Sequence, residues 1–116
     1  MAEIHSLIEG ASAEMNAYVI AESRILDSES GALARYVEIA LPSISRYDGR
    51  VIASGGSPEV AEGHWEPDVT FAVVEFPAMD RAREWYHSGE YAGALEIART
   101  EMNRCLVFSE GYPANI

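Results

Sequence analysis

Apolar residues in this chain follow a period of two in some segments and a helical period in others, which predicts both strands and helices. Four segments combine alternation or short apolar runs with β-branched and aromatic residues, so we expect four strands. The second strand begins at residues 50–56, and the adjacent Gly55 and Gly56 favour a bulge after which it continues through residues 57–63. The predicted strands are residues 17–26, 50–63, 69–76 and 104–111.

The longest helical pattern lies between the first two predicted strands. Asp27 and Ser28 offer an N-cap, and apolar positions then keep helical spacing through residues 33–47. Pro42 predicts a kink or a break there, because proline lacks an N–H and its ring clashes with the preceding turn. Gly49 is available to end the helix in the left-handed conformation.

A second helical pattern follows the third predicted strand. It begins near Met79 or Asp80 and runs through Tyr86, and we expect Trp85 to be a core residue. Ser88 can cap a further helical piece, because a serine hydroxyl accepts from the free backbone N–H groups of a first turn. The apolar stripe of that piece is Tyr91, Ala94, Leu95 and Ala98.

The first 15 residues carry one apolar stripe at helical spacing, which predicts a short helix. The stripe consists of Ile4, Leu7, Ile8, Ala11 and Met15. This helix either covers a surface of its own chain or reaches a partner subunit. Because 116 residues are enough for one domain, we divide the chain into an N-terminal helical arm, residues 1–16, and a single domain, residues 17–116.

The order strand, helix, strand, strand, helix, strand is that of the ferredoxin-like βαββαβ fold, an α+β fold with a four-stranded antiparallel sheet. Two helices cover only one face of such a sheet. The third and fourth strands are nevertheless apolar on both faces, as in "VTFAVV" and "CLVF", although a solvated face normally carries polar residues. We therefore expect a homodimer in which two sheets pack face to face, a homodimeric α/β barrel. The competing explanation is that the N-terminal helix covers its own sheet.

The net charge and the cysteine content limit the classes of partner and the cellular compartment that fit this chain. The net charge is −11, from 19 acidic residues and 8 arginines with no lysine, which argues against nucleic acid and anionic membranes as partners. The single cysteine, Cys105, cannot form an internal disulfide, which fits a cytoplasmic location. Its apolar neighbours predict a buried, inert thiol. No apolar run is long enough for a membrane span, and the first residues lack the pattern of a signal peptide.

Two carboxylates are candidates for acid/base chemistry. Alternation along the third strand places Glu75 on the same face as Phe71 and Val73. A carboxylate on an apolar face meets a cation or a hydroxyl, or its pKa rises, so Glu75 is either catalytic or a structural carboxylate. Glu62 follows the second predicted strand close to Trp65, which suggests the mouth of a pocket; the alternative is an ordinary turn residue.

Four further side chains are candidates for ligand binding, and the first is Trp65, which stands beside Glu62 at the expected pocket mouth. Arg99 presents a planar fork of donors that suits a ligand carboxylate, and its alternative is an ion pair with Glu62 or Glu75. Tyr47 and Tyr86 have apolar rings and hydroxyls that can line a pocket, or they belong to the core or its rim. The spacing of His and Cys residues fits no metal site, and no nucleotide-binding motif is present, so we expect neither a metal nor a cofactor.

Several segments together resemble the DUF1330 family of small uncharacterised proteins, whose members are similar to the dimeric α/β-barrel superfamily. The segments are "YVIAE", "RYDGRVIASGG", "EVAEGHWEP" and "VVEFPAMDRAREWYHSGEY", followed by Arg99. The resemblance covers residues 17–111 and implies the same fold and dimer. Two departures are Asp48, where a second glycine is common, and Ser54, where an arginine is often found; the latter weakens the expectation of an anion site beside the glycine pair.

The resemblance implies no established activity for this family, but the superfamily includes cofactor-free oxygenases and isomerases. By that analogy we expect a homodimer with a small-molecule pocket. In that pocket a cofactor-independent enzyme would carry out acid/base chemistry on a small organic acid, lactone or aromatic compound. Glu62 or Glu75 would move a proton, Arg99 would hold an anion, and Tyr47 would orient the ligand. The alternative is a non-catalytic ligand-binding or structural dimer, so the sequence leaves open whether the protein is an enzyme.

Overall fold

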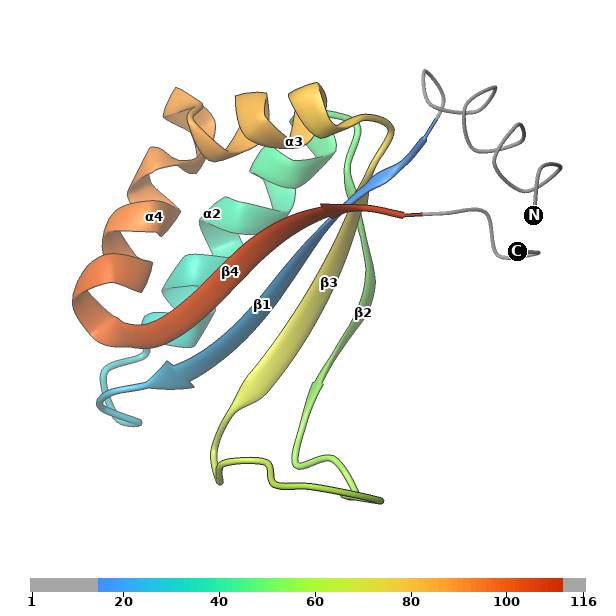
Figure 1. Ribbon diagram of the computed structural model, residues 1–116. Helices are drawn as coiled ribbons and strands as arrows, with labels where there is room; N and C mark the ends of the chain where they lie inside the picture. Colours follow the sequence, from blue (N-terminus) through green and yellow to red (C-terminus); the bar gives the residue numbers. More distant parts are fainter. Residues whose placement is uncertain (1–14, 112–116) are drawn as a thin grey trace, which may run out of the picture.

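The computed structural model describes residues 15–111, which form one sheet and three helices (Figure 1). The order of elements confirms the predicted one, with the second helical region divided into two helices. The predicted N-terminal helix lies outside the described residues except for Met15. The elements are β1 (Ala17–Ile25), α2 (Ala32–Arg46), β2 (Arg50–Gly56), β3 (Thr70–Phe76), α3 (Met79–Tyr86), α4 (Gly89–Glu101) and β4 (Met102–Glu110).

The four strands form one antiparallel sheet in the order β2-β3-β1-β4. Both central strands, β1 and β3, are therefore separated in sequence by a helix and a strand, as the ferredoxin-like fold requires. The register aligns Val19 of β1 with Val74 of β3 on one side and with Phe108 of β4 on the other. The predicted fold class, α+β with a four-stranded antiparallel sheet, is confirmed.

All three helices lie on one face of the sheet (Figure 1), and the core fills the space between these layers. Trp85 is the centre of this core and is only 1% exposed. Its ring lies 4.2 Å from the ring of Tyr91 and 5.4 Å from that of Phe76, measured between centroids. Its indole Nε1 donates a hydrogen bond of 2.9 Å to the buried Ser43 hydroxyl. The prediction that Trp85 is a core residue is confirmed.

The other face of the sheet carries no helix of the described chain. Its centre is Ile20, which lies between Val73 of β3 and Val107 of β4 in the strand register. Ile20 is 40% exposed, which is high for isoleucine. Cys105 lies on this open face opposite Glu22 and is exposed, so the prediction of a buried cysteine is wrong for the single chain. The apolar neighbours of Cys105 misled this prediction, because they face opposite sides of the sheet. Leu106 points to the core side, and Val107, like Cys105, points to the open face.

The start of α2 differs from the predicted one. Neither Asp27 nor Ser28 is the N-cap; Asp27 instead accepts a hydrogen bond from the backbone N–H of Glu29 within a turn. The N-cap is Gly31, at a φ of 73° that glycine adopts readily. The sequence predicted a kink or a break at Pro42; the helix runs through this residue without a break, and the kink stays a prediction.

The end of α2 uses Asp48 rather than Gly49 as its left-handed residue. Asp48 has a φ of 65°, and the backbone N–H groups of Asp48 and Gly49 donate to the carbonyls of Ser45 and Ile44, the pattern of a Schellman motif. Gly49 is required for a different reason. A Cβ at this position would lie 2.5 Å from Cε1 of Phe76, so the close approach to the core leaves no room for a side chain.

β2 ends at Gly56, and residues 57–69 contain no strand, so the predicted continuation through residues 57–63 is wrong. Ser57 turns the chain with a φ of 51°, and the proline that follows it lacks the N–H that a strand pair needs. The bulge lies earlier than predicted, between Val51 and Ala53. By contrast, α3 spans the predicted residues, and the Ser88 hydroxyl caps α4 by accepting from the backbone N–H of Tyr91, as predicted.

Candidate functional site

An apolar cavity of about 210 Å³ lies between α2 and the helix-facing side of the sheet. Tyr36, a phenol, and Ser54, an aliphatic alcohol, are its hydroxyl-bearing lining residues, and its other walls are mainly hydrocarbon. We call it the inner cavity. Its lining residues are Val19, Ala21, Tyr36, Val37, Ala40, Leu41, Ile44, Val51, Ser54, Ala72, Val74, Trp85 and Leu106.

Small side chains on three separate elements leave this space open. Ala21 of β1, Ala40 of α2 and Ala72 of β3 all line the inner cavity, and an alanine methyl group fills little of the gap between a helix and a sheet. On the edge strand, Val51 is exposed although it points to the helix side of the sheet, since it is opposite the buried Val74. Thus α2 does not close over β2, and the cavity is open on that side.

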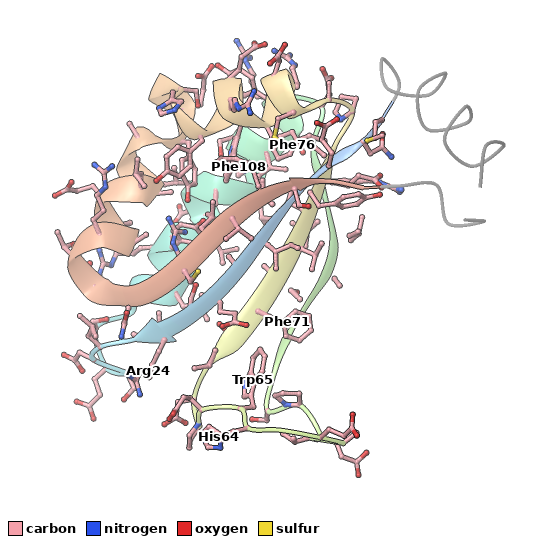
Figure 2. The ribbon with its side chains drawn as sticks, in the orientation of Figure 1. Arg24, His64, Trp65, Phe71, Phe76 and Phe108 are labelled. Carbon is pink, nitrogen blue, oxygen red and sulfur yellow. The ribbon has the colours of Figure 1, made fainter. Side chains whose placement is uncertain are left out.

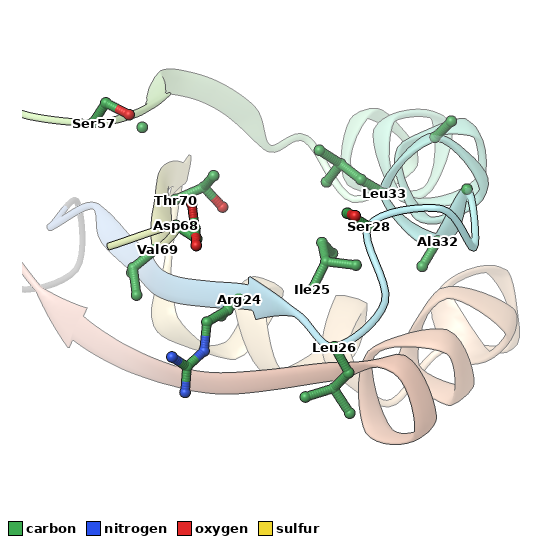
Figure 3. Close-up of a pocket in the computed structure, with 13 residues that line it drawn as sticks. Arg24, Ile25, Leu26, Ser28, Ala32, Leu33, Ser57, Asp68, Val69 and Thr70 are labelled. Atoms are coloured by element: carbon green, nitrogen blue, oxygen red, sulfur yellow. The ribbon is translucent and has the colours of Figure 1, made fainter. Parts of the chain in front are cut away.

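A second, wider hollow of about 670 Å³ lies between the start of α2, the end of β1 and the two ends of the β2–β3 loop (Figure 3). We call it the outer hollow. Leu33 and Ile25 contribute apolar surface from α2 and β1, and Ser57 and Asp68 contribute polar groups from the two ends of the β2–β3 loop. Arg24 also lines the outer hollow at the end of β1, but its side chain lies on the same side of β1 as those of Ile20 and Glu22 and points to the open face of the sheet. The outer hollow lies beside the start of α2 and the inner cavity further along the same helix; we call the two spaces together the trough.

A hydrogen-bonded cluster of two phenols and an arginine lies beside the inner cavity. The hydroxyls of Tyr36 and Tyr91 are 2.7 Å apart, and Nη1 of Arg104 donates to both, at 3.0 and 3.1 Å. Burial raises the pKa of Tyr91 well above that of a free phenol, so this phenol stays protonated. Sequence reasoning missed this cluster, although Arg104 alternates with Met102 and Leu106 on the core side of β4, an unusual position for an arginine.

Glu75 lies on the open face of the sheet, the face that also carries Val73, and has two partners. The Tyr18 hydroxyl donates to it over 2.9 Å, and Arg50 forms an ion pair with it at 3.0 Å. These contacts, the Tyr18 hydrogen bond first, hold the pKa of Glu75 below its ordinary value. Glu75 is therefore ionised near neutral pH and has the partners expected of a structural carboxylate. Its role in acid/base chemistry stays a prediction.

Replacing Tyr18 by phenylalanine is expected to raise the pKa of Glu75 and to lower the free energy of unfolding by about 1 kcal/mol at neutral pH, because one hydrogen bond to a carboxylate is lost. The native state lowers the pKa of Glu75, so the stabilisation exists above the unfolded-state pKa and is lost as the pH falls through the folded-state pKa. In urea titrations, the difference between wild type and Tyr18→Phe should therefore shrink at acidic pH.

Tyr47→Phe is the matched control, because the Tyr47 hydroxyl donates to Glu90 at an exposed position and its loss should cost less. A stability difference for Tyr18→Phe that does not depend on pH would contradict the assignment and would indicate that the Tyr18 hydroxyl acts independently of Glu75.

Glu62 and Trp65 lie in the β2–β3 loop, at the opposite end of β3 from Glu75. The five steps along the strand from Thr70 to Glu75 alone extend over about 16 Å, so the structure does not bring the two carboxylates together. Glu62 is exposed. Trp65 is half-buried with its ring perpendicular to that of Phe71, and its Nε1 donates to the carbonyl of Val69 (Figure 2). The catalytic role of Glu62 and the ligand-binding role of Trp65 stay predictions.

The remaining predicted ligand residues fall into two places. Tyr47 follows α2; its hydroxyl donates to Glu90, and the Arg81 guanidinium lies 4.8 Å from its ring centroid. That hydrogen bond raises the pKa of Tyr47. Tyr86 and Arg99 are brought together, because both line a hollow of about 400 Å³ between α4 and β4. Their roles in ligand binding also stay predictions.

Within residues 15–111, no group of three or more His, Cys, Asp or Glu side chains is arranged to hold a metal ion. None of the helices in this part of the chain combines the length and the apolar character needed to cross a bilayer.

Several solved structures share this fold at low sequence identity. The RPA0582 protein of unknown function from Rhodopseudomonas palustris has 15% identity and a TM-score of 0.71, covering 97% of this chain and 95% of its own. A dimeric protein of unknown function with a ferredoxin-like fold from Bacteroides fragilis has 16% identity and a TM-score of 0.54, covering 83% and 96%. SnoaB, a cofactor-independent oxygenase from Streptomyces nogalater, has 6% identity and a TM-score of 0.64, covering 86% and 96%.

These identities are low enough that the likeness shows the fold alone. No curated protein sequence matches the chain. The model of the DUF1330 family, a domain of unknown function, matches residues 16–112, which is most of the chain and includes the whole sheet and all three helices. The chain therefore belongs to the DUF1330 family.

Proposed function

We propose that this protein is a homodimer in which each subunit binds a small molecule with an apolar body in the trough between α2 and the sheet. The observation that carries the proposal is the inner cavity, an apolar space in the layer where a closely packed core is the norm. Empty space between side chains forfeits dispersion contacts, and a ligand of matching shape restores them.

The dimensions and chemistry of the trough indicate the class of ligand. An apolar cavity of about 150 Å³ is enough to bind benzene, so an inner cavity of about 210 Å³ suits one substituted aromatic ring or a short branched chain. The outer hollow adds Ser57, Asp68 and Thr70, which suit a polar end group that donates hydrogen bonds. The ligand is thus a small amphiphile whose apolar end lies in the inner cavity and whose polar end lies in the outer hollow.

The dimer is the second part of the proposal, and its support is the open face of the sheet. Ile20, Val73 and Val107 form a row across three strands on this face. Apolar patches on an open sheet face are typical of protein interfaces. The occupant that we propose is a second copy of the chain, because solved proteins with this fold are described as dimeric ferredoxin-like proteins.

Acid/base catalysis by Glu62 or Glu75 on a small organic acid, lactone or aromatic compound is the second candidate function. Its support is the fold shared with SnoaB, which is described as a cofactor-independent oxygenase. Neither carboxylate lines the inner cavity or the outer hollow of its own chain. Binding without catalysis is therefore the better supported of the two.

A thermal-shift screen with benzyl alcohol, indole, phenylacetate and short-chain alcohols tests ligand binding. A ligand at about 100 times its Kd is expected to add about 2.7 kcal/mol of stability, a shift of several degrees for a domain of this size. Ala72→Leu should abolish the shift, because the larger side chain fills the inner cavity from β3. Ala92→Leu is the matched control, since Ala92 is exposed on α4 and lines neither part of the trough.

No stabilisation by any of these compounds would contradict the proposal, as would a full shift in Ala72→Leu. Turnover of a stabilising compound that is lost in Glu62→Gln or Glu75→Gln, with binding retained, would support the catalytic version instead.

A further inference from the structure

The arginines of this chain divide into two groups by their partners. Five of the eight form ion pairs with carboxylates of the described chain; these are Arg35, Arg46, Arg50, Arg81 and Arg83. The other three have no described carboxylate within ion-pair distance; these are Arg24, Arg99 and Arg104. Two of these three, Arg99 and Arg104, line the same hollow.

This hollow lies between the last turns of α4 and the start of β4 and has a volume of about 400 Å³. We call it the α4–β4 hollow. Its polar wall consists of Arg99, Asn103 and Arg104, and its apolar wall includes Tyr86 and Leu106. No Asp or Glu lines it. An arginine pair without a carboxylate, beside an amide and an aromatic ring, is the chemistry that binds an oxyanion on an apolar body.

Arg104 is held in place by groups that do not neutralise it. Its Nη1 donates to the hydroxyls of Tyr36 and Tyr91, which are both neutral acceptors. A guanidinium has five N–H donors, and within the described chain these two hydrogen bonds are the ones that Arg104 forms. The side chain is half-buried, so its charge is partly removed from water. A partly desolvated charge without a counter-charge is costly, and a bound anion offsets that cost.

Arg99 also has a structural role, because a positive charge in the last turn of a helix interacts favourably with the helix dipole. That role needs no second arginine and does not account for Arg104, which belongs to β4. The two guanidinium groups come from different elements and meet at one hollow. A ligand that bridges them accounts for both positions.

We propose that the α4–β4 hollow is an oxyanion site, in which Arg99 and Arg104 bind a carboxylate or phosphate group and Tyr86 with Leu106 contacts the apolar part of the same molecule. This site goes beyond the proposed function, because its arginines line a different hollow from the inner cavity; of the lining residues, the two spaces share Leu106. It does not require a ligand in the trough.

Titrations of the full chain with benzoate, with inorganic phosphate and with sodium chloride at matched ionic strength test this site. The readouts are heat of binding and the NMR signals of the arginine Nε–H groups. Binding of benzoate, phosphate or both, with shifts of the Arg99 and Arg104 signals, is expected. Loss of one charge-assisted contact in Arg99→Gln should raise the Kd about tenfold or more. Arg104→Lys keeps the charge, loses the fork and should also weaken binding.

Arg83→Gln is the matched control, because Arg83 is exposed on α3 and lines no part of the hollow; it should bind the probes as wild type does. Arg99 is exposed, so Arg99→Gln tests the site even if Arg104→Lys does not fold. Binding of benzoate but not phosphate would identify a carboxylate ligand, and binding of phosphate but not benzoate would identify a phosphate ligand. Binding of both would show that the site accepts either oxyanion. No binding of either probe beyond the chloride control would overturn the proposal, as would equal weakening in Arg83→Gln. Either result would leave the Ala72→Leu test of the trough unaffected.

Discussion

Replacing Trp85 by alanine is expected to lower the free energy of unfolding by about 3–5 kcal/mol, the range for removing a buried aromatic side chain. The indole is almost fully buried between Phe76 of β3 and Tyr91 of α4, so it joins the sheet to the helical layer. The substitution also removes the hydrogen bond to the Ser43 hydroxyl, which is buried in α2. Since domains of this size are stable by about 5–15 kcal/mol, the loss is a large share of the total.

Chemical denaturation at a fixed protein concentration measures this loss, and the second tryptophan supplies the control. Trp65→Ala removes a side chain of equal size from the β2–β3 loop, where it is half-buried against Phe71. It should cost less than about half as much, because less apolar area leaves water contact at that site. Equal losses for the two variants would show that the core does not depend on Trp85 as described.

Replacing Ile20 by glutamate is expected to convert the protein from a dimer to a folded monomer. Light scattering should give twice 12.7 kDa for the wild type and 12.7 kDa for Ile20→Glu. Ile20 lies between Val73 and Val107 on the open face, so a charge there would be buried between two sheets, and an unpaired buried charge costs several kcal/mol. In the monomer the position is 40% exposed, so the fold itself tolerates the change.

Leu33→Glu is the control for this experiment. Leu33 is similarly exposed, at 47%, but belongs to α2 on the other side of the sheet. The variant should remain a dimer. A wild-type monomer would contradict the proposed homodimer, and a dimeric Ile20→Glu would show that the subunits meet through another surface.

The elements that sequence reasoning predicted correctly are those with a repeating signal. β3 is a short apolar run rich in β-branched and aromatic residues that Pro77 stops, and the Ser88 hydroxyl marks the start of α4 because few residue types cap a helix. The start of α2 was less predictable. Asp27 has the chemistry of a cap, but that chemistry also suits a turn, and the backbone conformation of Gly31 decided between them.

The candidate site was less predictable than the fold, because its space depends on distances between elements. Ala21, Ala40 and Ala72 are far apart in sequence, and nothing in their local patterns indicates that the three leave a cavity when α2 packs over the sheet. Arg104 is different. Its position on the core side of β4, between Met102 and Leu106, is a signal that the sequence contains, and it predicts a buried partner for a guanidinium.

The bulge at residue 52 has a consequence for growth beyond two subunits. β2 is an edge strand, and the free backbone donors and acceptors of an edge are a template to which further chains add without limit. The extra residue between Val51 and Ala53 breaks the regular spacing of those groups and twists the strand. An incoming strand therefore finds no continuous row to match along β2. This irregularity opposes fibre formation at β2. The apolar row around Ile20 remains available for the dimer contact, which one partner subunit covers.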